Sequence, residues 1–210
     1  DSKTVSTLGI ATMKGIQSQV ISVVKHFPGH GDTSTDSHVG LPFVSHDMDR
    51  LKEFELVPFQ AAADNGADAV MTAHILLTAV DAENPATLSW PVITDILRRD
   101  MGFDGVVITD DMTMGAILEN YDIGDAAVKS VLAGTDIILV CHGHEKMTEV
   151  LESLKAAVTA GTIPESELDR RLIRILGLKQ KYGINDNKTA PKDLEDINER
   201  IKKVLSGLGS

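Results

Sequence analysis

Four short runs of apolar, mostly β-branched residues, separated by helical patterns, limit the folds that this sequence can adopt. The runs are VISVVK (20–25), AVMTA (69–73), GVVIT (105–109) and DIILV (136–140). Unbroken apolar runs of this length are typical of strands that are covered on both faces, as in parallel sheets. Because helical segments lie between the runs, we expect parallel strands that are joined by right-handed crossovers.

The segments between the runs carry the start and stop signals of helices. Apolar residues recur at helical spacing in 48–65, 91–100, 125–133 and 145–160, and a glycine follows each segment. Further helices are expected at 4–19, 165–182 and 194–205. A closed (β/α)₈ barrel needs about 250 residues, and four βα units with three flanking helices already use this chain of 210 residues. The pattern therefore predicts half of such a barrel or a small open doubly wound sheet.

A polar stretch, INDNKTAP, separates the last helix from the rest of the chain. We expect one unit over residues 1–183, followed at 184–210 by a polar linker and a peripheral tail helix. The net charge of −11 and the aromatic content of 4% argue against nucleic acid as a partner. No apolar run approaches the roughly 20 residues that a membrane span requires. The single cysteine, Cys141, excludes an internal disulfide.

Polar side chains follow all four apolar runs at the point where each expected strand ends. Parallel α/β folds place their functional sites at the carboxyl ends of strands. Loops carry polar residues in any fold, but four consecutive strands that end this way favour a site. The residues are Lys25 and His26, Thr72 and His74, Thr109 to Asp111, and Cys141 with His142.

The loop after the first run, KHFPGHGDTSTDSHVGLP (25–42), is the most informative stretch. Its histidines and aspartates offer ligands for zinc, but the helical HExxH spacing is absent and the loop is rich in Ser and Thr instead. We therefore expect neither a metal nor another cofactor. The candidate ligands are His26, His30, Asp32, Asp36 and His38.

Asp36 and His38 suggest a second chemistry. Residues i and i+2 of an extended segment point the same way, so the Asp36 carboxylate can orient the His38 ring for proton transfer. Such a pair is otherwise an ordinary solvated loop pair, and it gains meaning only beside a nucleophile. Asp110 or Asp111, after the third run, offers one, and periodicity alone does not choose between them.

The segments KHFPGHGDTSTDSH, MTAHI and GVVITDDMTMGAI closely resemble the bacterial β-N-acetylglucosaminidases of glycoside hydrolase family 3, over about residues 1–182. The resemblance implies a (β/α)₈ barrel of which this chain is the C-terminal half. It implies that Asp110 is the nucleophile, that Asp36 and His38 form the acid/base dyad, and that Lys25 and His26 hold sugar hydroxyls. We also expect His74 to bind substrate.

The resemblance implies a retaining hydrolase that removes β-linked N-acetylglucosamine from peptidoglycan-derived or related glycosides. A neutral histidine does not repel an incoming anion, so a phosphorylase of the same family is an alternative. An inactive half-barrel and a metal-dependent hydrolase are two others. The half-barrel leaves edges and apolar surface open, so we expect a closing partner, either the N-terminal half or a second copy. The sequence leaves the cellular compartment open.

Overall fold

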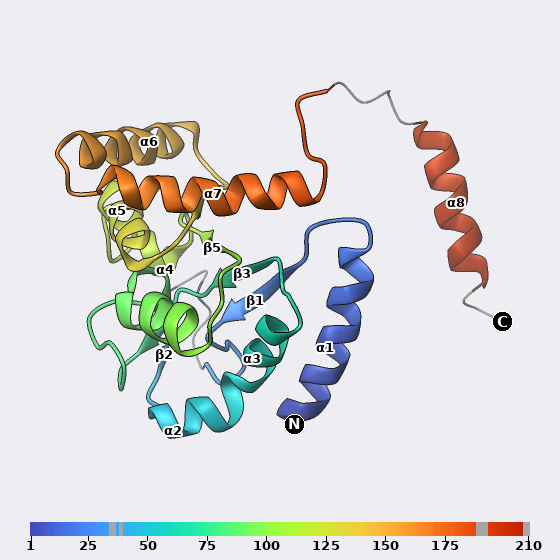
Figure 1. The fold of residues 1–210 in the computed structure, drawn as a ribbon, viewed down its shortest axis with the longest axis horizontal. Coiled ribbons are helices and arrows are strands. Elements are labelled where there is room, and N and C mark those ends of the chain that lie inside the picture. The colour runs from blue at the N-terminus through green and yellow to red at the C-terminus, as the bar shows by residue number, and fades with distance from the viewer. Residues whose placement is uncertain (34–36, 38–39, 188–192, 208–210) are drawn as a thin grey trace.

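The chain forms a parallel sheet of four strands with helices packed against it, as the alternating pattern predicts. The computed structural model describes residues 1–33, 37, 40–187 and 193–207. The sheet has the order β1 (Val23–Phe27), β3 (Ala69–Thr72), β5 (Val106–Asp111) and β6 (Ile137–Leu139), which is the order along the chain (Figure 1). All three pairings are parallel. The carboxyl ends of these strands therefore lie together at one end of the sheet.

Helices follow the strands where the sequence places their caps. Asp1 and Asp122 cap two of them through their side chains, and Gly134 ends the helix that Asp122 begins, at a φ of 122°. The helical elements are α1 (Ser2–Gln17), α2 (Met48–Arg50), η1 (Leu51–Glu55), α3 (Val57–Asp64), η2 (Ala86–Leu88), η3 (Pro91–Asp100), α4 (Gly115–Leu118), α5 (Ile123–Ala133), α6 (His144–Thr159), α7 (Glu165–Lys181) and α8 (Leu194–Gly207). η1 and η3 are π-helical, and η2 is a 3₁₀ turn.

The first strand lies later in the sequence than predicted. The expected strand was 20–25, whereas β1 spans Val23–Phe27. Val20 is 58% exposed, and the backbone N–H of Ser22 donates to the Asp68 carboxylate rather than to a strand. The strand prediction was wrong at this boundary because the apolar pattern continues through a turn. A small parallel pair, β2 (Phe43–Val44) with β4 (Leu76–Leu77), was not predicted.

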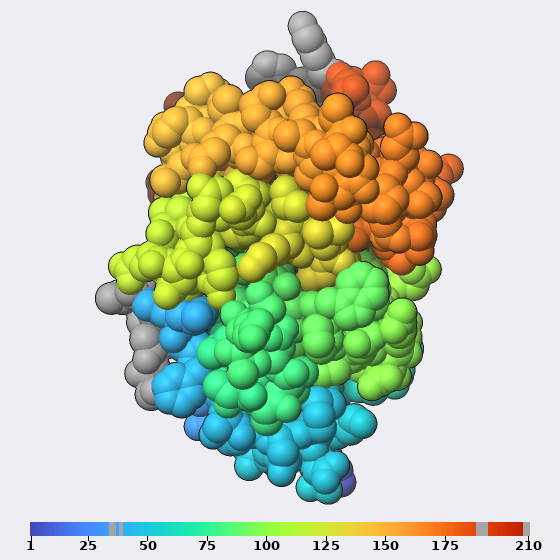
Figure 2. All heavy atoms as spheres, turned by 90° about the vertical axis from the view of Figure 1, so that its left-hand side faces the viewer, coloured from blue at the N-terminus to red at the C-terminus, as the bar shows by residue number. Residues whose placement is uncertain are grey.

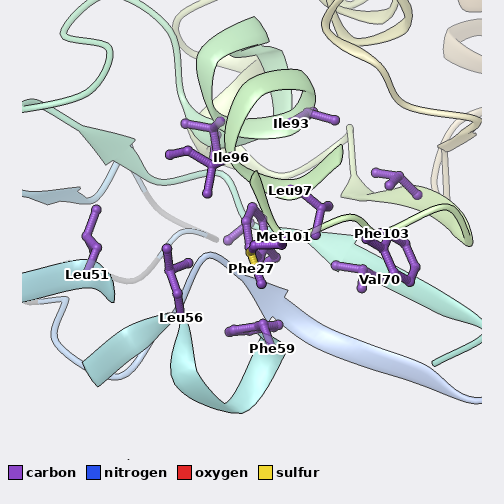
Figure 3. Close-up of a cluster of buried hydrophobic side chains, with 14 of the residues drawn as sticks. Phe27, Leu51, Leu56, Phe59, Val70, Ile93, Ile96, Leu97, Met101 and Phe103 are labelled. Atoms are coloured by element: carbon purple, nitrogen blue, oxygen red, sulfur yellow. The ribbon is translucent and has the colours of Figure 1, made fainter. Parts of the chain in front are cut away.

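The main core lies between the sheet and the helices α3 and η3. Phe27 is fully buried and meets Phe59 edge-on, with their ring centroids 5.2 Å apart. Figure 3 shows these rings among side chains from β3 and η3, including Val70, Ile96 and Leu97. Each large apolar side chain that is buried in this way contributes about 1.5–3 kcal/mol. The core thus fixes the three strands whose ends carry the candidate residues.

The sheet is open at both edges, since β1 and β6 each pair with one neighbour in the described parts of the chain. Figure 2 shows the segments following one another in sequence order, from α2 and η1 (cyan) to α6 and α7 (orange). An apolar groove of about 630 Å³ runs along β6, with Leu139, Leu151 and Leu172 among its lining residues. Open edges and an uncovered groove are surfaces on which another segment can pack.

The helix α8 lies apart from the other elements (Figure 1) and contains no buried residue. The division of the chain at 183/184 stays a prediction. Over the described ranges, every helix is too short or too polar to cross a membrane.

Candidate active site

Asp110 and Asp111 occupy opposite sides of β5, which distinguishes two carboxylates that the sequence leaves equivalent. Burial alternates along the strand: Val107, Thr109 and Asp111 are buried, whereas Ile108 and Asp110 are partly exposed. Because side chains alternate across a strand, Asp110 shares the less covered face with Ile108. Its side chain is 20% exposed at the carboxyl end of the sheet. Asp110 is therefore the carboxylate that a ligand can reach.

The Asp111 carboxylate is engaged in holding the backbone. One oxygen accepts hydrogen bonds from the backbone N–H groups of Thr113 and Cys141, both at 2.9 Å, and the other accepts from Thr113 Oγ1 at 2.6 Å. Burial alone raises the pKa of Asp111, but these hydrogen bonds outweigh burial and hold the pKa below its ordinary value. Asp111 is thus a charged anchor between the ends of β5 and β6.

His26 lies close to one carboxylate oxygen of Asp110. Its Nε2 atom lies 3.5 Å from Asp110 Oδ2, and its side chain is 28% exposed. Burial lowers the pKa of His26, and Lys25 and His30 lower it further, whereas the Asp110 charge opposes them. At neutral pH the ring is therefore uncharged, so it can orient the carboxylate or a sugar hydroxyl without forming an ion pair. Lys25 is exposed and lines the same cavity as His26.

His74 lies beneath this site, with 1% of its surface exposed. Its Nδ1 atom is 2.9 Å from Thr87 Oγ1, and its Nε2 atom is 3.0 Å from the Asp111 carbonyl oxygen. Burial lowers the pKa of His74, although the Asp111 carbonyl and the nearby carboxylates oppose the shift. The substrate contact predicted for His74 stays a prediction, and both of its ring nitrogens face protein groups.

The expected acid/base dyad, Asp36 and His38, lies outside the described residues. Ser37, between them in the sequence, is buried and is held from two sides. Its carbonyl oxygen accepts from the backbone N–H of Ala116 at 3.2 Å, and its hydroxyl is 3.2 Å from His30 Nε2. Ala116 follows Asp110 by six residues, so this contact brings the loop near the end of β5.

A cavity of about 670 Å³ opens beside Lys25 and His26, between α1 and α3. Arg50, Phe54 and Glu55 also line it, and none of the three was predicted to belong to a site. Arg50 bonds Glu55 through two nitrogens, and its guanidinium lies 4.6 Å from the centre of the half-exposed Phe54 ring. In the sequence they form part of an ordinary helical segment, so no pattern marks them.

Of the candidate zinc ligands, the described part of the chain contains His26, His30 and Asp32. Among the residues that the structure describes, no group of three or more His, Cys, Asp or Glu side chains is placed to hold a metal ion. Asp32 is paired with His46 at 2.8 Å, and His30 with Thr33 Oγ1 at 2.8 Å.

The sequence profile of the glycosyl hydrolase family 3 N-terminal domain matches residues 1–178. The chain belongs to this family. It is 33% identical over 196 residues to a beta-hexosaminidase A from Pseudoalteromonas piscicida, a match that covers 84% of this chain and 33% of that protein. The chain thus spans about a third of this relative's length.

Solved structures agree with this assignment. A family 3 beta-N-acetylglucosaminidase from Paenibacillus sp. superposes with a TM-score of 0.87 at 46% identity, covering 90% of this chain and 36% of that one. A beta-glucoside phosphorylase superposes with a TM-score of 0.75 at 27% identity, covering 84% and 33%. The parallel sheet and its helices are therefore part of a TIM-barrel-like fold, as the sequence predicts.

Proposed function

We propose that the chain is the nucleophile-bearing part of a retaining glycosidase that removes β-linked N-acetylglucosamine. The observation that carries the proposal is the placement of Asp110: it is partly exposed at the carboxyl end of β5, and its Oδ2 atom faces His26. In its neighbour Asp111, one carboxylate oxygen accepts from two backbone N–H groups and the other from the Thr113 hydroxyl. The similarity to beta-hexosaminidases and to a beta-N-acetylglucosaminidase supports the choice of substrate class.

In the proposed first step, Asp110 Oδ2 attacks the anomeric carbon as the glycosidic bond breaks. His38, oriented by Asp36, gives its proton to the leaving oxygen, and a covalent glycosyl–Asp110 ester results. In the second step, His38 takes a proton from water, the water oxygen bonds to the anomeric carbon, and the ester breaks. Two inversions give overall retention. Ser37, which stands between Asp36 and His38 in the sequence, contacts His30 and Ala116, and these contacts support the proposed dyad.

Lys25 and His26 are proposed to bind sugar hydroxyls. Both line the cavity beside β1, and His26 also contacts Asp110, so a sugar held by these residues lies next to the nucleophile. We propose glycosides derived from peptidoglycan as the substrates. The open edges of β1 and β6 support the proposal that activity needs a closing partner, either the N-terminal barrel half or a second copy.

A phosphorylase is the second candidate, favoured by the similarity to a beta-glucoside phosphorylase. In that reaction phosphate replaces water in the second step and the product is a sugar 1-phosphate. In the second step the dyad histidine acts as a neutral base, so it does not repel an incoming phosphate anion.

The test is hydrolysis of a chromogenic N-acetylglucosaminide by the full chain, alone and with an N-terminal barrel half, with and without phosphate. We expect turnover in the assembled enzyme and free N-acetylglucosamine as the product. Asp110→Asn is expected to abolish turnover, while Asp104→Asn, the same change at an exposed aspartate before β5, leaves turnover unchanged. Full activity of Asp110→Asn would contradict the proposal, and a sugar phosphate product would favour the second candidate.

A further inference from the structure

A chain of buried hydrogen bonds runs from β3 to the end of β5. Thr72 Oγ1 lies 3.1 Å from Thr87 Oγ1, which lies 2.9 Å from His74 Nδ1. The Nε2 atom of His74 then meets the Asp111 carbonyl oxygen at 3.0 Å. Thr72, Thr87 and His74 are all at most 1% exposed. Buried polar groups of this kind are costly unless every member has a partner, so the chain specifies one arrangement of the core.

The chemistry of the partners fixes the direction of the bond between His74 and Asp111. A carbonyl oxygen only accepts, so His74 Nε2 carries the proton and donates to Asp111. The lowered pKa of His74 keeps the ring neutral, which leaves Nδ1 as an acceptor for the Thr87 hydroxyl. Thr87 Oγ1 also lies 2.9 Å from the Ala73 carbonyl oxygen, which accepts from the Thr87 backbone N–H at 3.3 Å as well. The single hydroxyl proton of Thr87 can go to this carbonyl or to His74 Nδ1, and Thr72 donates to Thr87.

The contacts that hold Asp111 also fix the orientation of Asp110. Its carbonyl oxygen is held by His74 and its carboxylate by Thr113 and Cys141, so the residue is fixed at both main chain and side chain. Its backbone N–H donates to Asp110 Oδ1 at 2.8 Å. This bond occupies one oxygen of Asp110 and leaves Oδ2 turned toward His26.

We propose that His74 is a positioning residue for the reaction: it holds the Asp111 backbone, and through the Asp111 N–H it orients the Asp110 carboxylate. The proposal rests on the proposed role of Asp110 as nucleophile. This positioning role replaces the direct sugar contact that the sequence suggested for His74.

Two matched variants in the assembled enzyme test this role. His74→Leu removes the donor to Asp111, whereas His74→Gln keeps an amide N–H that can reach the same carbonyl. Since a small misplacement of a reacting group costs about 10²-fold in rate, we expect His74→Leu to lower kcat by about 10²-fold with KM within about twofold. We expect His74→Gln to recover most of that loss. A raised KM with unchanged kcat indicates a direct substrate contact and overturns the proposal, as does wild-type kcat in both variants.

A second measurement does not depend on activity. In ¹⁵N spectra of the full chain, His74, assigned by its loss in His74→Gln, is expected to be neutral at pH 7 with its proton on Nε2. Thr87→Val is expected to shift its Nδ1 signal, and Thr87→Ser to leave it in place. His74→Leu is expected to shift the Asp111 amide signal and His74→Gln to leave it near its wild-type position. A charged ring, a proton on Nδ1 or an unmoved Asp111 amide overturns the proposal. Absence of turnover by the wild-type assembly counts only against the proposed function.

Discussion

Truncating each of the two adjacent aspartates to alanine separates the anchor from the nucleophile by their effects on stability. Asp111→Ala removes three hydrogen bonds to a charged acceptor and leaves the backbone N–H groups of Thr113 and Cys141 without that acceptor. Bonds to charged groups contribute about 1.5–3 kcal/mol each, and the breakage of a buried charged contact typically costs about 3–5 kcal/mol in total. Asp110→Ala removes one hydrogen bond, from the Asp111 N–H, at a partly exposed carboxylate. We expect it to cost about 1 kcal/mol or less.

Urea unfolding of the full chain, followed by far-UV circular dichroism, measures both costs. With a slope of about 2–3 kcal/mol per molar urea, Asp111→Ala is expected to lower the midpoint by about 1–2 M, and Asp110→Ala by less than about 0.5 M. Asp111→Asn is the matched control, because its amide can still accept from the two backbone N–H groups, and a smaller loss is expected. Equal midpoints for Asp110→Ala and Asp111→Ala would refute the assignment of Asp111 as the anchor.

Three further predictions concern acid catalysis, pH and assembly. In the assembled enzyme, His38→Ala is expected to slow the hydrolysis of substrates with poor leaving groups more than that of activated substrates, because activated leaving groups need little protonation. Asp36→Asn is expected to give a milder loss in the same direction. Equal losses across a leaving-group series count against His38 as the acid. His74 has a lowered pKa in the folded chain, so below its unfolded pKa of about 6.5 the unfolded state binds an extra proton, and the free energy of unfolding falls as pH falls. Between pH 7 and 5.5 this group contributes a loss of up to about 1 kcal/mol, which His74→Gln is expected to remove in denaturant titrations at the two pH values; an unchanged pH dependence contradicts it. Size-exclusion and sedimentation measurements are expected to find the chain associated with itself or with an N-terminal half, and a monodisperse monomer that melts cooperatively contradicts this.

The strand order could be predicted because each buried strand is a short apolar run that is flanked by helical signals. The start of β1 could not, because the apolar pattern begins at Val20, in a turn where Ser22 bonds Asp68. The strands β2 and β4 have two residues each, which is too short to show an alternation of apolar and polar residues.

The position of the candidate site could be predicted from the sequence, but the separate roles of its residues could not. The sequence places Asp110 and Asp111 at the end of a strand, yet the choice between them depends on which face the helices cover. The place of His74 in a buried chain depends on Thr87, 13 residues away on η2, and no local pattern links them. Arg50 and Phe54 line the cavity together with residues of α1 and α3, and the cavity exists only once these helices pack together.

Covalent trapping tests the central claim most directly. The assembled enzyme is incubated with a 2-fluoro or similarly slowed N-acetylglucosamine-like glycoside that has an activated leaving group, then digested and analysed by mass spectrometry. We predict a single sugar adduct, placed by fragmentation on Asp110, and no adduct in Asp110→Asn under the same conditions. An adduct on Asp111, on a loop residue between 29 and 46, or retained in Asp110→Asn would contradict the assignment of Asp110 as the nucleophile.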